Sequence, residues 1–247
     1  MILEYHLPHS LDEAVSLLTR KDVLTYPLGG GTILSCQQKE NCEVVDLKHL
    51  GLSQLQPVDA NLQIGAATTL ADLRVFTDLP LGLSMAIDRE STFNIRQVAS
   101  IAGTLVTCDG RSVLGAAMLA LDAQLVWAPG GVQVSFGDWL PVRHNWKKAN
   151  LITSVNIPLK VELLVEIVSR SPLDFPIACV AVGRWPGGRT RVVLAGHGDA
   201  PIVAMDGREA DGADAAAVEA YAHANDTWAS AEYRQDVIRT LLNRILT

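Results

Sequence analysis

The sequence predicts a protein of the α+β class, in which small α/β units precede an antiparallel sheet with helices. Two observations indicate this. In residues 1–158, short runs of apolar and β-branched residues alternate with stretches of helical periodicity. In residues 162–247 the pattern changes, because strand-like runs follow one another before a single amphipathic helix. We therefore expect one domain over 1–158, with subdomains of about 1–52 and 53–158, and a second over 162–247.

The first block predicts a small α/β unit. Ser10 and Glu13 have the spacing of a capping box at the start of a helix. The elements expected here are a strand at 2–7, a helix at 10–21, a strand at 25–28, a helix at 33–38 and a strand at 44–47.

The second block mixes strands and helices, and Pro158 ends its last strand. A helix is expected to begin near 69, with Thr68 or Thr69 as its cap. The remaining elements are a strand at 61–66, helices at 81–87 and 113–121, and strands at 124–128, 132–136 and 151–157.

The last third predicts a meander closed by a helix. Strands are expected at 162–170, 177–185 and 189–195, and the polar stretch 206–217 is expected to be a loop. Residues 230–246 are amphipathic, with Arg234 among the residues expected on the polar face.

Composition and charge limit the function. The net charge of the 247-residue chain is −7 and only 5% of residues are aromatic, which argues against a nucleic-acid partner. The four cysteines form no CxxC pair, so we expect no metal or iron–sulfur cluster on this chain. Glu4, His6 and His9 interrupt the first apolar residues, so no signal peptide is expected, and no eighteen-residue apolar run predicts a membrane span. The expected compartment is the cytoplasm.

Two segments poor in side chains stand about seventy residues apart. The first, 27–34, reads PLGGGTIL, and the second, 95–105, reads IRQVASIAGTL. Backbone amides that are bare of side chains can converge on an anion such as a pyrophosphate. Two such segments predict a clamp on a dinucleotide, whereas each alone would suit an ordinary turn.

These segments resemble those of the FAD-binding (medium) subunit of the molybdenum hydroxylases, as in CO dehydrogenase and the FAD domain of xanthine dehydrogenase. The family patterns A-G-G-T-[DS]-L and I-R-N-x-A-T-I-G-G-N-L match residues 29–34 and 95–105. Further ordered matches fall at 116–123, 150–158, 170–176 and 229–246. The resemblance therefore spans nearly the whole chain.

The resemblance implies a fold, a cofactor and partners. The fold would be a PCMH-type FAD-binding fold of two α/β subdomains, followed by a shortened C-terminal domain of the CO dehydrogenase flavoprotein type. FAD would take electrons from the [2Fe–2S] small subunit, which receives them from a molybdopterin-binding large subunit, and would pass them to NAD, a quinone or oxygen. No side chain of this chain is expected to act as an acid or a base.

The candidate cofactor-binding residues come from both segments and from three later positions. They are Pro27, Leu28, Gly29, Gly30, Gly31, Thr32, Ile33, Leu34, Ser100, Ile101, Ala102, Gly103, Thr104, Asp109, Ile152 and Glu166. Asp109 is a candidate for a ribose contact or for a plain turn, and Ile152 for the flavin ring or the core.

Four positions depart from the family pattern. Ala102 replaces a glycine, Thr104 an asparagine and Val113 an aspartate, and Glu166 replaces a lysine near the flavin of xanthine dehydrogenase. Asp109 or Ser112 is expected to take the place of the missing aspartate. These departures keep a second hypothesis open, a structural or assembly subunit that has lost FAD. A stand-alone flavin reductase is a third reading, and no proton donor in the sequence favours it.

Overall fold

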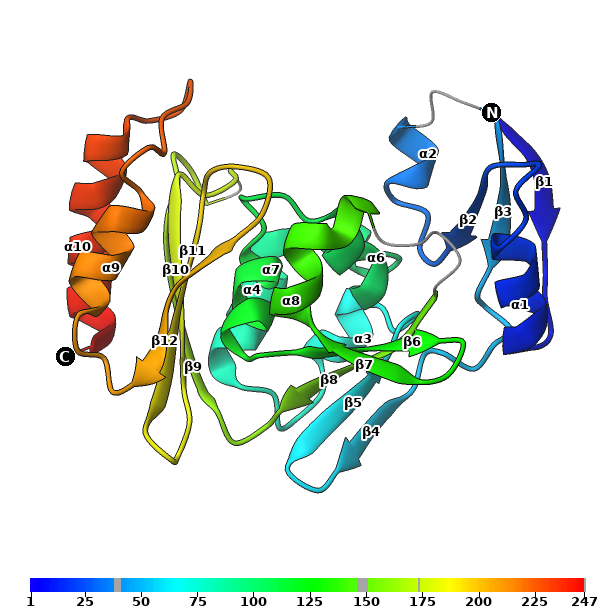
Figure 1. The fold of residues 1–247 in the computed structure, drawn as a ribbon, viewed down its shortest axis with the longest axis horizontal. Helices are drawn as coiled ribbons and strands as arrows, with labels where there is room; N and C mark the ends of the chain where they lie inside the picture. The colour runs from blue at the N-terminus through cyan, green and yellow to red at the C-terminus, as the bar shows by residue number, and fades with distance from the viewer. Residues whose placement is uncertain (38–40, 146–150, 173, 247) are drawn as a thin grey trace. The chain divides into compact units, whose positions relative to one another are not determined.

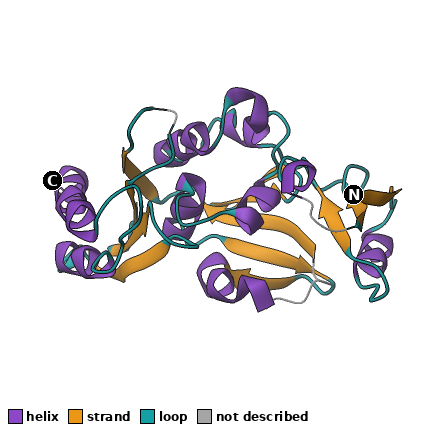
Figure 2. Ribbon diagram, turned by 90° about the horizontal axis from the view of Figure 1, so that it is seen from above, coloured by secondary structure: helices purple, strands orange, loops and turns teal. Residues whose placement is uncertain are grey.

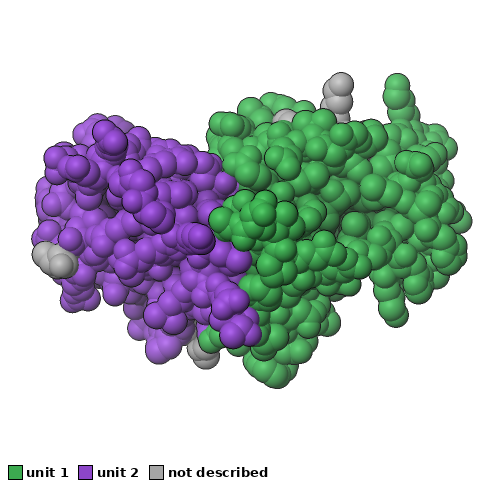
Figure 3. All heavy atoms as spheres, turned by 90° about the horizontal axis from the view of Figure 1, so that it is seen from below, with its two compact units in different colours: residues 1–76, 93–107, 124–157 green, residues 77–92, 108–123, 158–247 purple. Residues whose placement is uncertain are grey.

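The computed structural model describes residues 1–37, 41–145, 151–172 and 174–246 (Figure 1). Contacts group these residues into two compact units (Figure 3). Unit 1 holds 1–76, 93–107 and 124–157, and unit 2 holds 77–92, 108–123 and 158–247. The domain boundary expected at residue 158 stays a prediction. The two packing units do not follow it along the chain, because residues 77–92 and 108–123 belong to unit 2.

The first sheet of unit 1 is parallel and has three strands. Its order is β1 (Ile2–His6), β3 (Cys42–Asp46) and β2 (Thr25–Leu28). Helix α1 (Leu11–Leu18) covers it by packing Ala14 and Leu18 against Val45. The capping box forms as predicted, because Ser10 Oγ accepts from the N–H of Glu13 at 3.2 Å.

The second sheet of unit 1 has five strands, ordered β4-β5-β8-β6-β7. Short helices connect and cover these strands (Figure 2). The strands are β4 (Leu55–Val58), β5 (Asn61–Gly65), β6 (Gln124–Ala128), β7 (Val132–Ser135) and β8 (Leu151–Pro158). The helices of unit 1 outside α1 are α2 (Leu34–Gln37), α3 (Leu70–Arg74), α5 (Phe93–Arg96), α6 (Ile101–Thr107), α8 (Phe136–Trp139) and the 3₁₀ helix η1 (Leu140–Asn145).

Unit 2 is built on an antiparallel sheet with helices on both faces. The strand order is β12 (Ile202–Arg208), β11 (Arg189–Ala195), β10 (Ala178–Arg184) and β9 (Glu162–Val168). Helices α9 (Ala213–Ala220) and α10 (Ala231–Leu246) pack on one face, and α4 (Leu81–Glu90) and α7 (Val113–Ala120) on the other (Figure 1). The predicted α+β class, with a C-terminal antiparallel sheet, is confirmed.

The prediction of a loop at 206–217 is wrong. Residues 206–208 end strand β12, and residues 213–217 begin helix α9. The stretch is rich in alanine and aspartate, and its helix is stabilised by burial of Ala213 and Ala217 in the core below α10. Tertiary packing outweighs the polar composition here.

Arg234 was expected on the exposed face of the last helix, and the structure corrects this. Its side chain is 0% exposed, because it donates to the carbonyl oxygens of several segments as well as to Asp226. These acceptors are Ile177 O at 2.9 Å, Ala229 O at 2.8 Å, Gly196 O at 3.4 Å and Ala224 O. Both carboxylate oxygens of Asp226 lie 2.9 Å from Nη2. Arg234 thus fastens the end of the chain to the sheet.

Glu90 is a partly buried charged group of unit 2. Its carboxylate accepts from the N–H of Leu114 at 2.8 Å and from the Ser112 hydroxyl at 3.0 Å, and so caps α7. Burial raises the pKa of the Glu90 carboxyl above its usual range, and the hydrogen bonds from Leu114 and Ser112 oppose that rise only in part.

Among the described residues, no helix is long and apolar enough to cross a membrane.

Candidate functional site

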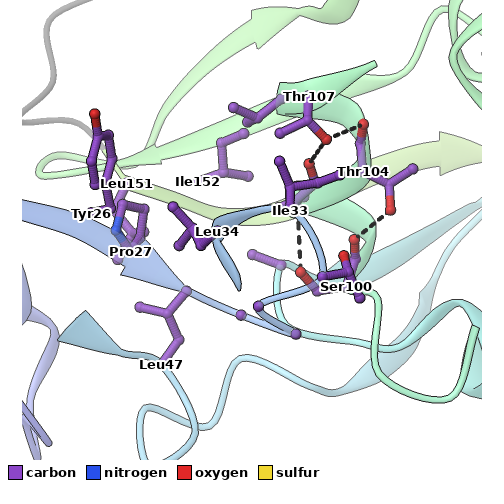
Figure 4. A pocket seen from close by; sticks show the side chains of 18 of the residues that line it. Tyr26, Pro27, Ile33, Leu34, Leu47, Ser100, Thr104, Thr107, Leu151 and Ile152 are labelled. Carbon is purple, nitrogen blue, oxygen red and sulfur yellow. Dashed lines mark hydrogen bonds between the residues drawn. The ribbon is translucent and has the colours of Figure 1, made fainter. Parts of the chain in front are cut away.

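Unit 1 contains a cavity of about 370 Å³ to which both of its sheets contribute (Figure 4). This volume falls within the roughly 300–1,000 Å³ of small-molecule sites. Twelve of the sixteen predicted site residues line it. They are Pro27, Gly29, Gly30, Gly31, Thr32, Ile33, Leu34, Ser100, Ala102, Gly103, Thr104 and Ile152.

The two predicted segments lie directly against each other. A Cβ placed on Gly30 would lie 1.7 Å from the carbonyl oxygen of Val98, and one on Gly29 would lie 2.5 Å from Ser100 Oγ. At Gly30 the clash is with backbone, so no side chain fits there, whereas a side chain at Gly29 would require the Ser100 hydroxyl to move. These two glycines therefore serve the contact between the segments, which fixes one wall of the cavity.

The first segment lines the cavity and carries unused hydrogen-bond donors. It connects β2 to α2, and Gly31 turns the chain with φ of +70°, a conformation that favours glycine. Within the described part of the chain, we find no acceptor for the backbone N–H groups of residues 29–33. Consecutive backbone N–H groups of this kind suit an anion.

The second segment is a helix rather than a turn, and its amides are already in use. The N–H of Ile101 donates to Thr68 O at 2.9 Å, and that of Ala102 donates to Ala66 O at 3.2 Å. Gly103 N donates to Ser100 Oγ at 3.3 Å. Ala102 lies in α6 without a positive φ, so its methyl group causes no backbone strain.

Hydroxyl groups distinguish this second segment and the rest of α6. Thr104 Oγ1 donates to Ser100 O at 2.9 Å and Thr107 Oγ1 to Gly103 O at 2.8 Å, so both protons bond to their own helix (Figure 4). The Ser100 hydroxyl differs, since it accepts from Gly103 N and no acceptor for its proton is found in the described ranges. It is buried, 5% exposed, and lines the cavity beside Gly29.

Four predicted site residues do not line the cavity. Leu28 lies in β2, and Ile101 is fully buried in α6. Asp109 and Glu166 belong to unit 2. Asp109 Oδ1 accepts from the N–H of Arg111 at 2.8 Å, as in a turn, and Glu166 is a half-buried residue of β9 opposite Val180.

Ten further residues line the cavity, and none of them was predicted from the sequence as a site residue. They are Thr25, Tyr26, Leu47, Ala66, Val106, Thr107, Trp127, Trp139, Arg143 and Leu151. Trp127 and Trp139, expected as core or interface residues, are 5% and 2% exposed, and their rings lie 5.7 Å apart. Leu151 precedes the predicted Ile152 in β8, whereas nothing local in the sequence marked Arg143.

One group of residues could hold a metal by geometry, and its surroundings argue against this. Ligand atoms of Glu4, His6 and Glu43 lie within 4.8 Å of one another. The Arg20 guanidinium, however, pairs with the same Glu43 oxygen that lies 2.7 Å from His6 Nε2. A cation is already present there, so we assign no metal to this cluster.

The fold and the site define a dinucleotide-binding protein. A largely apolar cavity meets a row of free backbone donors at one wall, and such a site fits a long cofactor with aromatic ends and an anionic centre. Residues 1–160 match the family model described as the FAD binding domain in molybdopterin dehydrogenase. The chain belongs to this family, and FAD is its cofactor.

Comparisons with known proteins agree with this family assignment. The chain is 26% identical over 200 residues to the uncharacterized protein YgfM of Escherichia coli K12, covering 79% of this chain and 75% of YgfM. It matches reconstituted CO dehydrogenase from Oligotropha carboxidovorans with a TM-score of 0.82 and 26% identity, over 98% of this chain and 95% of the other. Quinoline 2-oxidoreductase from Pseudomonas putida 86 shares the fold, with a TM-score of 0.80, 18% identity, and coverage of 100% and 96%.

The family resemblance predicted from the motifs is thereby confirmed, as are the fold and the cofactor. The family's proteins are oxidoreductases, and the chain is the FAD-binding component of such an enzyme.

Proposed function

We propose that this chain is the electron-transfer subunit of a molybdenum-containing hydroxylase. In this role it would pass electrons from a partner's [2Fe–2S] clusters through FAD to NAD, a quinone or oxygen. The observation that carries the proposal is the row of backbone N–H groups at residues 29–33, which belong to residues that line the cavity and have no acceptor in the described part of the chain.

Different residues of the cavity would bind different parts of the cofactor. The N–H groups of 29–33 and the hydroxyl of Ser100 would donate to the pyrophosphate, because no acceptor for them is found among the described residues. Ile152 and the tryptophan pair supply apolar walls that exclude water. The bound flavin supplies the redox chemistry, and no side chain needs to move a proton.

The proposed partners are a molybdopterin-binding large subunit and a [2Fe–2S] small subunit. Two observations support this. The structures that the chain matches include CO dehydrogenase, and the sequence itself has no cysteine pattern for a cluster. A ribose contact for Asp109 and a place near the flavin ring for Glu166 remain predictions from the resemblance.

The first test is the visible absorption spectrum of the purified chain, followed by heat release of the chromophore. Bound FAD near one per chain would support the proposal. Anaerobic reduction, followed by mixing with NAD⁺, a quinone or oxygen, would then identify the acceptor by the fastest reoxidation. A colourless chain that takes up no added FAD would refute the proposal and favour a structural or assembly subunit.

A further inference from the structure

The charge of the cavity is concentrated in one side chain. Among the described residues that line it, Arg143 alone carries a charge, and the others are glycines, hydroxyl residues and apolar or aromatic residues. A pyrophosphate brings two negative charges into this space. Burying an anion without compensation is costly, so its partners decide whether it binds.

The backbone at Arg143 is held in place by neighbouring packed residues. It follows Trp139 by four residues, where α8 continues into η1. Ser135 caps α8 by accepting from the N–H of Asp138 at 3.0 Å. Trp139 is 2% exposed and packs on Trp127 at 5.7 Å and on Phe136 at 6.1 Å between ring centroids. The backbone that carries Arg143 is thus fixed by buried aromatic packing.

The other donors of the cavity cannot supply a full charge. The first turn of α6 offers little, since the N–H groups of Ile101 and Ala102 donate to the carbonyl oxygens of Thr68 and Ala66. The amides of 29–33 carry only partial charges. A guanidinium stays charged at every accessible pH and presents paired donors that match phosphate oxygens.

We propose that Arg143 is the counter-ion of the cofactor's pyrophosphate, and that it makes the cavity select ligands with a diphosphate. The inference rests on the proposed binding of FAD in this cavity. In this arrangement the backbone amides of 29–33 orient the pyrophosphate, and Arg143 balances its negative charge.

The test compares wild type with Arg143→Gln and Arg143→Lys. Arg244→Gln on the exposed face of α10 is the matched control, because it changes the net charge equally and lies in unit 2. The ligands are FAD, ADP, adenosine and riboflavin, with affinities from flavin fluorescence and from competition. Losing a charge-assisted contact should weaken FAD and ADP by about 10- to 100-fold in Arg143→Gln. Lysine should restore part of that loss.

The ratio of adenosine to ADP affinity separates this role from a structural one. If Arg143 pairs with the pyrophosphate, Arg143→Gln lowers the preference for ADP while adenosine and riboflavin bind as in wild type. Equal weakening of all four ligands would instead mean that Arg143 only supports the cavity, and would overturn the inference. Unchanged FAD affinity in Arg143→Gln would overturn it as well. If wild type itself binds no FAD, the proposed function fails, whatever Arg143 does.

Discussion

Replacing Gly30 by alanine should separate the two segments that form the cavity wall. The added Cβ would start 1.7 Å from Val98 O, whereas real Cβ contacts keep at least 3.0 Å, so the segments must part by about 1.3 Å. Val98 contributes backbone there, which cannot rotate away. A shift of that size moves the donors of 29–33 out of hydrogen-bond range of a ligand held by the rest of the cavity.

The expected loss follows from those donors. One hydrogen bond to a charged group contributes roughly 1.5–3 kcal/mol, so losing one weakens FAD binding by about 10- to 150-fold. Titration of the apoprotein with FAD, followed by quenching of flavin fluorescence, measures this loss. Urea unfolding of the same variant measures the cost to the fold.

Gly31→Ala is the matched control for this prediction. Its Cβ would meet the ends of two side chains, Leu28 Cδ1 at 3.2 Å and Ser35 Oγ at 3.6 Å, but its φ of +70° strains an alanine. We expect a stability loss of roughly 1–2 kcal/mol from that strain and a smaller effect on FAD than in Gly30→Ala. Wild-type FAD affinity and stability in Gly30→Ala would refute the argument from contact.

Three other predictions concern Ser100, Arg234 and Glu90. Ser100→Ala should weaken FAD by about 10-fold, and equal affinities in a fluorescence titration would remove Ser100 from the site. Arg234→Met should cost roughly 3–5 kcal/mol of unfolding free energy, because buried acceptors lose their donor, whereas the exposed control Arg239→Met should cost under about 0.5 kcal/mol in the same urea series. Because its pKa is raised in the folded state, Glu90 makes wild type lose stability as pH rises from about 4.5 through that raised value. Thermal unfolding of Glu90→Gln should show a flatter pH profile, and superimposable profiles would contradict this.

Local signals were sufficient for most helices and strands. The capping box at Ser10 and the runs of β-forming residues in β8 and β10 are properties of neighbouring residues, so the sequence indicates them directly. The glycine run at 29–31 marked the first wall of the cavity for the same reason. Its role in packing against Val98 was not predictable, because the partner lies about seventy residues away.

The features missed from the sequence depend on distant partners. The residues AGT at 102–104 suggest a turn, and α6 forms because Thr68 and Ala66 accept its first amides. Arg234 has the sequence context of a surface residue, and its acceptors come from other strands and loops. Arg143 lies in no recognised motif and reaches the cavity only through the packing of η1.

The order in which segments along the chain contribute to the two units has a consequence for engineering and for evolution. The chain passes from one unit to the other five times, and α4 and α7 precede by far the sheet of β9, β10 and β11 that they cover. A fragment ending at 158 would carry these helices with no sheet to cover, and the remainder would expose the strand faces that they protect. A crossover near 158 between two relatives would therefore join mismatched halves of one core. We expect the parts to be inherited together, and chimeras to fold only when residues 77–92 and 108–123 are exchanged with the C-terminal segment.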